Sequence, residues 1–310
     1  MDEEVFAQIA ATLAQREKLE WFQFNAYETT PAIADSLVSI ITNNQSVQGL
    51  ALSMTSTQDA TDALRVAKAL GQSHASWVIL DRFGDKVNRA TVMDPQVAQA
   101  FAQSAIENTN LQEISFVDYL IDETAATLFA EAITQRAPNS VYLGHNGLTD
   151  DTFALLQPAL ENNSNLVWLG VVLQQLTDVS PLITFYNNFN LSSFWISYAS
   201  QNPIDSTSLT TLTTKLATDS QLGSLGLDGL GIDDQGMQQL AQAVVQNSVL
   251  QQISLEDNNY TVAGARSIMN TLETNQSLVW CDLDKNVLME IPEEEMSVFW
   301  HRLFENGNRG

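Results

Sequence analysis

The chain repeats one apolar pattern at a short, nearly constant interval. Three segments near its C-terminal end align without gaps: LGSLGLDGLGI from Leu222, LQQISLEDNNY from Leu250 and LVWCDLDKNVL from Leu278. Each has an apolar residue at its first, fourth, sixth and eleventh places, and the three starts are 28 residues apart. One unit of this length cannot bury its apolar face alone, so the units must stack on one another. The pattern therefore predicts a solenoid.

The same frame continues towards the N-terminus and gives ten repeats in all. The seven earlier starts are Leu19, Val47, Ala75, Leu111, Pro138, Leu166 and Leu191. The fourth and sixth places are apolar in every repeat: Phe22/Phe24, Leu50/Leu52, Val78/Leu80, Ile114/Phe116, Val141/Leu143, Leu169/Val171, Phe194/Ile196, Leu225/Leu227, Ile253/Leu255 and Cys281/Leu283. Two apolar residues separated by one residue are typical of a short strand with one buried face. We therefore expect ten such strands.

A second column of residues stands three positions before nine of these starts. It consists mostly of asparagine: Asn44, Gln72, Asn108, Gln135, Asn163, Asn188, Asp219, Asn247 and Asn275. Asparagine tolerates the left-handed conformation that commonly ends a helix. Helical spacing of apolar residues, such as Leu240 with Val244, precedes the column. We interpret the column as the end of a helix in each repeat.

The spacing L-x-x-L-x-L-x-x-N-x-L resembles leucine-rich repeats, and a period near 28 residues resembles their ribonuclease-inhibitor-like subfamily. The resemblance covers residues 19 to about 289. It implies a right-handed α/β solenoid of horseshoe shape, with parallel strands on the concave face and helices on the convex face. The ninth-place asparagine of the family occurs only at Asn146, Asn258 and Asn286. The middle repeats therefore depend on their apolar places.

We expect residues 1–310 to form a single solenoid domain with a cap at each end. Residues 1–18 read as an N-terminal cap helix whose apolar stripe is Val5, Ile9 and Leu13. Residues 290–310 read as a C-terminal cap or tail in which Phe299, Trp300 and Leu303 pack inward. The third repeat is the longest, and its extra residues around 85–95 bring a basic cluster, Arg82, Lys86 and Arg89. This insertion is either a loop beside the binding face or a tolerated surface loop.

Aromatic residues occupy places that should project from the concave face. Trp21, Trp77, Trp168 and Trp280 stand at the third place, Tyr142 and Trp195 at the fifth, and Tyr198 at the eighth. Exposed tryptophan and tyrosine are common anchors of protein interfaces. The pattern favours a protein-binding concave face. The alternative is that the indoles lie flat on neighbouring strands and brace the sheet.

Carboxylates replace aromatic rings in the C-terminal repeats. Asp228, Glu256 and Asp284 share the seventh place, and Asp282 stands beside them at the fifth. Parallel strands lie about 4.8 Å apart, so these residues should form a ladder of carboxylates. We interpret the ladder as a docking patch for lysine or arginine of a basic partner. A solvated face of an acidic protein is the alternative.

Charge and composition limit the possible partners. The chain has 13 basic and 37 acidic residues, a formal net charge of −24. Such a chain offers no broad cationic surface, so we expect neither nucleic acid nor anionic membranes as partners. The start MDEEVFAQIA is acidic where a secretory signal is basic, and a single cysteine, Cys281, excludes an internal disulfide. We expect a cytoplasmic monomer that binds a protein.

No motif for catalysis, a metal or a cofactor stands out. The zinc-protease, serine-hydrolase and phosphate-loop patterns do not occur. Asp282, Asp284, Asn286 and Glu293 match part of a calcium-binding EF-hand loop, but Val287 stands where that loop requires glycine. Cys281 falls on a buried strand place. We expect a protein that is not an enzyme and holds neither metal nor cofactor; an enzyme with an unrecognised site is the alternative.

The C-terminal glutamates suggest a more specific role. Glu290, Glu293, Glu294 and Glu295 resemble the glutamate-rich tail of substrates of a bacterial type IV secretion system. This resemblance implies an effector that is delivered into a host cell and binds a host protein. A capping helix with an acidic first turn explains the same residues.

Overall fold

A computed structural model describes residues 2–26, 29–54, 61–81 and 95–308. The chain forms two compact units, Met1–Leu166 and Val167–Gly310. Whether the two units form the expected single domain of residues 1–310 depends on how they join, so the single domain stays a prediction. The basic cluster Arg82, Lys86 and Arg89, with most of the insertion at 85–95, lies outside the described residues.

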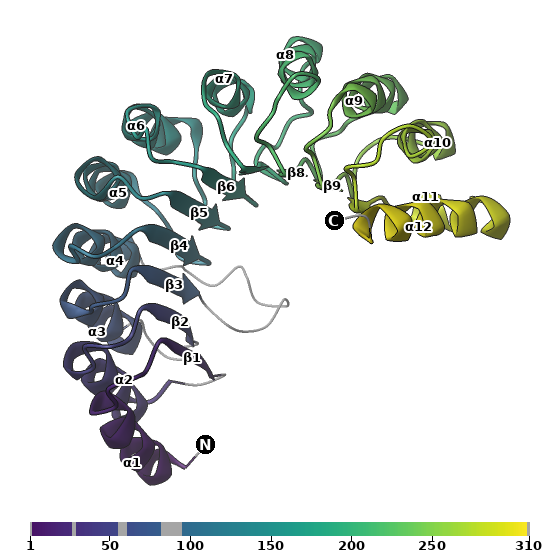
Figure 1. Cartoon of the computed structure of the whole chain (residues 1–310). Coiled ribbons are helices and arrows are strands. Elements are labelled where there is room, and N and C mark those ends of the chain that lie inside the picture. The colour runs from purple at the N-terminus through teal and green to yellow at the C-terminus, as the bar shows by residue number, and fades with distance from the viewer. Residues whose placement is uncertain (1, 27–28, 55–60, 82–94, 309–310) are drawn as a thin grey trace. The chain divides into compact units, whose positions relative to one another are not determined.

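The first unit alternates helices and strands along the chain. Its helices are α1 (Glu3–Ala14), α2 (Pro31–Asn43), α3 (Thr61–Ala69), the 3-10 helix η1 (Leu70–Gln72), α4 (Pro95–Glu107), α5 (Glu123–Arg136) and α6 (Asp150–Glu161). Its strands are β1 (Trp21–Ala26), β2 (Gly49–Met54), β3 (Trp77–Asp81), β4 (Glu113–Val117) and β5 (Ser140–Gly144). Successive strands pair in parallel, and the helices lie on one side of them (Figure 1).

The second unit has the same architecture, and its last four strands are shorter. Its strands are β6 (Trp168–Val172), β7 (Ser193–Trp195), β8 (Ser224–Gly226), β9 (Gln252–Ser254) and β10 (Trp280–Asp282). Its helices are α7 (Ser180–Asn188), α8 (Ser206–Leu216), α9 (Asp234–Gln246), α10 (Val262–Thr271), α11 (Lys285–Leu288) and α12 (Glu293–Gly307). Here too each strand pairs in parallel with the next one along the chain. Both units are α/β solenoids, which confirms the fold class.

The core lies between the sheet and the helices of each unit. Every fourth- and sixth-place residue named above is buried, none being more than 8% exposed. Within each unit the register aligns the fourth places of successive repeats, including the overlong third repeat, where Val78 pairs with Ile114. In the first unit it aligns the sixth places as well. The ten-repeat frame is therefore confirmed. None of the helices within the described ranges is long and apolar enough to span a membrane.

The asparagine column does end helices, but the expected left-handed conformation is wrong. Asn44 and Asn247 have φ of −84° and −82° with extended ψ. The side chain of Asn247 donates to the carbonyls of Leu216 and Asp219 in the preceding repeat, at 2.7 and 3.0 Å, and accepts from Leu250 N at 2.7 Å. Asparagine suits this position because its buried side-chain amide both donates and accepts, and so connects two repeats. Three more buried asparagines donate in the same way to the repeat or cap before them: Asn44, Asn275 and Asn306. Buried Asn108 and Asn163 donate instead to Ala75 O and Pro138 O, at the start of their own repeats.

Both ends carry the expected helices, with corrections to the faces that they bury. Helix α1 buries Phe6, Ala10 and Ala14, whereas Val5 and Ile9 of the expected stripe are exposed. Phe6 gives the better fit because its ring packs on Phe24, with centroids 5.0 Å apart. Helix α12 buries Phe299 and Leu303 as expected. Trp300 does not pack inward, being 49% exposed.

Candidate functional site

The sheet face that the helices leave uncovered is called the open face below. On it, residues at the same place of successive repeats lie side by side. In the first unit the third-place row is Trp21, Gly49, Trp77, Glu113 and Ser140. In the second unit it is Trp168, Ser193, Ser224, Gln252 and Trp280. The sequence frame thus identifies the neighbours of each aromatic ring.

Trp21 and Trp77 form a stacked pair across the strand between them. Their ring centroids are 4.2 Å apart and the planes are inclined by 29°. Gly49 of β2 lies beneath both rings, since a Cβ there would stand 2.1 Å from Trp21 Cε3 and 3.2 Å from Trp77 Cε3. Trp21 remains 40% exposed. The pair is a preformed aromatic platform at the edge of the first unit.

Trp195 and Tyr198 also lie over glycines of the next repeat, Gly226 in β8 and Gly229 in the turn after it. A Cβ on Gly226 would stand 2.2 Å from Trp195 Cε3, and one on Gly229 would stand 2.1 Å from Tyr198 Cδ1. The Trp195 indole donates to Ser224 Oγ at 3.1 Å, and the Tyr198 hydroxyl donates to the carboxylate of Asp257. Burial and this carboxylate raise the pKa of Tyr198. These contacts support the bracing interpretation for these two half-buried rings.

The other aromatic residues differ in exposure. Trp168 and Tyr142 are half-buried, whereas Trp280 is 57% exposed. Burial raises the pKa of Tyr142, with smaller contributions from Asp81 and Asp118. Of the proposed aromatic anchors, Trp280 offers the largest exposed fraction of its ring.

Asp228 is not the exposed rung that the sequence predicts. It is 8% exposed, and its carboxylate accepts from Ser197 Oγ at 2.9 Å, Ser254 Oγ at 2.6 Å and Glu256 N at 2.8 Å. Burial raises its pKa despite these hydrogen bonds. Because its hydrogen bonds connect three successive repeats, the buried side chain stabilises the sheet and is not available as part of a docking surface.

The remaining carboxylates of the row do face solvent. Glu256 and Asp257 are exposed, while Asp282 and Asp284 are half-buried. The pKa of Glu256 is raised first by burial and then by the negative charges of its neighbours, Asp282 before the others. Asp284 caps α11 by accepting from Asn286 N at 2.7 Å. We call Glu256, Asp257, Asp282 and Asp284 the acidic patch.

Catalytic or metal chemistry finds little support in the described residues. Asp282 is in β10, Asn286 in α11 and Glu293 in α12, so the partial calcium-loop match is divided among three elements. No group of three histidine, cysteine, aspartate or glutamate residues in the described ranges could hold a metal ion. Cys281 is buried, as expected, and burial raises its pKa.

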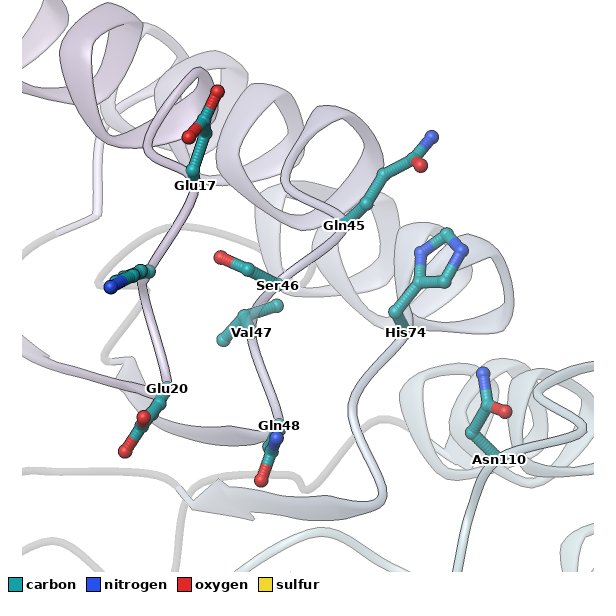
Figure 2. A pocket seen from close by; sticks show the side chains of 9 residues that line it. Glu17, Glu20, Gln45, Ser46, Val47, Gln48, His74 and Asn110 are labelled. Carbon is teal, nitrogen blue, oxygen red and sulfur yellow. The ribbon is translucent and has the colours of Figure 1, made fainter.

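A polar hollow of about 420 Å³ lies in the first unit where loops enter the strands. It is lined by Glu17, Lys18, Glu20, Gln45, Ser46, Val47, Gln48, His74 and Asn110. Figure 2 shows the side chains of Glu20 and Gln48 pointing to one side of the loops, away from Gln45 and His74. Because its titratable groups do not converge, the hollow does not support the enzyme alternative.

A likeness to a solved structure supports the fold. No protein-family profile and no curated protein matches the sequence. The structure is similar to a chain of the yeast Rad7 and Elc1 complex, with a TM-score of 0.59 and 10% identity over 91% of this chain. This chain spans 66% of that one. A second solved structure, actin-binding site 2 of leiomodin-1, matches 40% of this chain with a TM-score of 0.33 and 14% identity. The match covers 87% of the leiomodin-1 chain.

Sequence reasoning missed three features of the site. They are the glycines beneath the rings, the burial of Asp228 and the position of Glu113 beside Trp77. The first and third were readable from the repeat frame, because a glycine or glutamate stands at the same place as the ring in the next repeat. The burial of Asp228 depends on hydrogen bonds to residues about 30 positions away along the chain.

Proposed function

We propose that this chain is a non-catalytic, protein-binding solenoid that docks a basic segment of a partner on the acidic patch, with Trp280 as the apolar anchor beside it. One observation carries the proposal. None of the four carboxylates of the patch forms an ion pair with any described residue, and the pKa of Glu256 is raised by burial and then by the negative charges of its neighbours. A partner's ammonium or guanidinium group relieves the repulsion between these charges. Trp168 stands at the third place of β6 in the same unit and is half-buried.

The likeness to a Rad7–Elc1 chain supports a repeat protein of this kind, and that chain was found in a protein complex. Membership of the ribonuclease-inhibitor-like subfamily rests on the 28-residue period and the apolar spacing. A cytoplasmic, monomeric protein remains our expectation from the sequence. Delivery as an effector also remains an expectation, and the acidic first turn of α12, Glu293–Glu295, supports a capping helix equally well.

A capture experiment with charge-matched variants tests the proposal. The immobilised chain is exposed to lysate at about 50 mM and about 500 mM salt, because screening weakens exposed ionic contacts. We expect basic proteins to be retained only at low salt. The double variant Glu256→Gln/Asp282→Asn should retain about tenfold less of them, as should Trp280→Ala.

The control is Asp151→Asn/Glu161→Gln, which removes the same charge from exposed positions of α6 in the first unit. It should bind as the unmodified chain does. Equal losses in both double variants would mean that net charge alone attracts the proteins. Retention that survives high salt and both patch variants would place the partner elsewhere and refute the proposal.

A further inference from the structure

The Trp21–Trp77 platform has a carboxylate as its next neighbour. Trp77 of β3 pairs in the register with Glu113 of β4, on the side of β3 that faces away from Gly49. Trp21 stacks on Trp77 from the β2 side. The half-buried Glu113 is therefore the next residue of the row after Trp77, on the side that Trp21 does not occupy.

Glu113 has no partner in the described part of the chain. Its carboxylate accepts no hydrogen bond and forms no ion pair with a described residue. Burial raises its pKa, which indicates that the ionised form lacks compensation. The strands offer no cation, because the sequences of β1 to β5 contain no lysine, arginine or histidine.

An aromatic face beside an unpaired carboxylate is suited to a particular cation. A guanidinium group is planar, stacks on indole faces and donates two parallel N–H bonds to a carboxylate. A lysine ammonium is more strongly hydrated and gains less from the flat face of a ring. Aromatic stacking and charge together therefore favour arginine.

We propose that Trp21, Trp77 and Glu113 form an arginine-binding slot on the open face of the first unit, which takes an arginine side chain of a protein partner. Trp77 supplies the stacking surface, Trp21 holds its ring in place, and Glu113 accepts the guanidinium N–H groups. The slot rests on the proposed function, because the arginine that it binds belongs to a protein partner. Its residues are separate from those of the acidic patch.

The test uses the full chain and three capped tripeptides, glycine-X-glycine, where X is arginine, lysine or citrulline. Citrulline retains the shape of arginine without its charge. The indole N–H signals are followed by NMR, and those of Trp21 and Trp77 are assigned from Trp21→Phe and Trp77→Phe. We expect the arginine peptide to shift these two signals, the lysine peptide to bind more weakly, and citrulline to leave them in place.

Glu113→Gln should weaken binding of the arginine peptide about tenfold, the order expected for the loss of one charge-assisted pair. Glu161→Gln removes the same charge from an exposed position of α6 and should change nothing. Unchanged melting temperatures show that both variants fold. Equal shifts with citrulline, equal shifts of all six tryptophans, or full binding by Glu113→Gln would each overturn the slot.

The two proposals fail in different ways. If the peptide does not bind while capture by the acidic patch succeeds, only the slot is wrong. If the peptide binds while capture fails, the slot stands as an isolated arginine site and the proposed protein-binding function is wrong.

Discussion

Glycine and aromatic residues are paired across neighbouring repeats of the open face. Trp21 lies over Gly49, Trp195 over Gly226 and Tyr198 over Gly229, each glycine at the same place of the next repeat. A glycine within a strand usually weakens it, because it has no side chain to pack. Here the ring of the preceding repeat covers the exposed backbone. The aromatic residues thus contribute to the sheet before they contribute to any interface.

This pairing predicts the cost of adding one methyl group. In Gly226→Ala the new Cβ would lie 2.2 Å from Trp195 Cε3, so the ring must move. We expect a loss of about 1–3 kcal/mol in the free energy of unfolding, as is usual for overpacking. The matched control is Gly223→Ala, whose Cβ would have its nearest neighbour, Ser192 O, at 3.6 Å.

Urea denaturation of both variants measures the difference. The loss from Gly226→Ala should largely disappear in the Trp195→Ala background, because contacting residues are not additive. Similar stabilities for Gly226→Ala and Gly223→Ala would show that the Trp195 ring is free to leave the sheet. That result would support the interpretation of Trp195 as an anchor of a protein interface.

Buried asparagines join the ends of several helices to the repeat or cap before them. Asn247 makes two donor and two acceptor contacts with backbone groups, between 2.7 and 3.0 Å. Asn306 continues the series from α12, where it donates to Leu278 O at 2.9 Å. Helix α12 is therefore held as the last member of the stack.

Asn247→Ala should be strongly destabilising. Removing the buried amide takes this partner from Asp219 O, Val249 N and Leu250 N, and leaves Leu216 O with the contact from Asp219 N. We expect a loss of about 2–5 kcal/mol in the free energy of unfolding. Asn162→Ala is the control, because Asn162 is exposed and its side-chain hydrogen bond goes to Pro158 O of its own helix. Repeats interact mainly with their neighbours. Hydrogen exchange should therefore accelerate first in α8 and α9; uniform acceleration across the second unit would contradict this local role.

Along the whole chain, the sequence predicts the structural features that recur in every repeat. It misses those that depend on a contact made at one position. The apolar places and strand register follow from the period, so even β3, after which the repeat is overlong, is correctly placed. The stripe of α1 was misplaced by one position, because Val5 and Phe6 satisfy helical spacing equally well and only the contact with Phe24 decides between them. The sequence predicts an exposed Asp228, whereas in the structure its carboxylate is buried and accepts hydrogen bonds from Ser197 and Ser254.

Charge is the other property of the whole molecule, and its effect on stability depends on pH. Burial raises the pKa values of Glu113, Asp228 and Glu256. The folded state therefore binds protons more readily than the unfolded chain at these groups, and stability rises as the pH falls towards their pKa values. The net charge of −24 acts in the same direction, since protonation reduces self-repulsion.

Other carboxylates set the acid limit. Hydrogen bonds lower the pKa values of Asp205 and Asp234, and the Arg266 guanidinium lowers that of Glu295. The stability that these groups contribute is present above their unfolded pKa values, about 4, and is lost as the pH falls further. We therefore expect the melting temperature to rise from pH about 8 to about 5 and to fall below about 4.

Calorimetry across this range tests the prediction, and one variant separates its two causes. Glu256→Gln removes a carboxylate that its neighbours oppose, so it should raise the melting temperature at pH about 8 and flatten the rise towards pH 5. Glu161→Gln lowers the net charge equally and should flatten the curve less. Salt at about 0.5 M should reduce the rise in every variant by screening exposed charges. A melting temperature that falls steadily from pH 8 downwards would show that the favourably bonded carboxylates dominate, and that the acidic patch is already compensated within the folded chain.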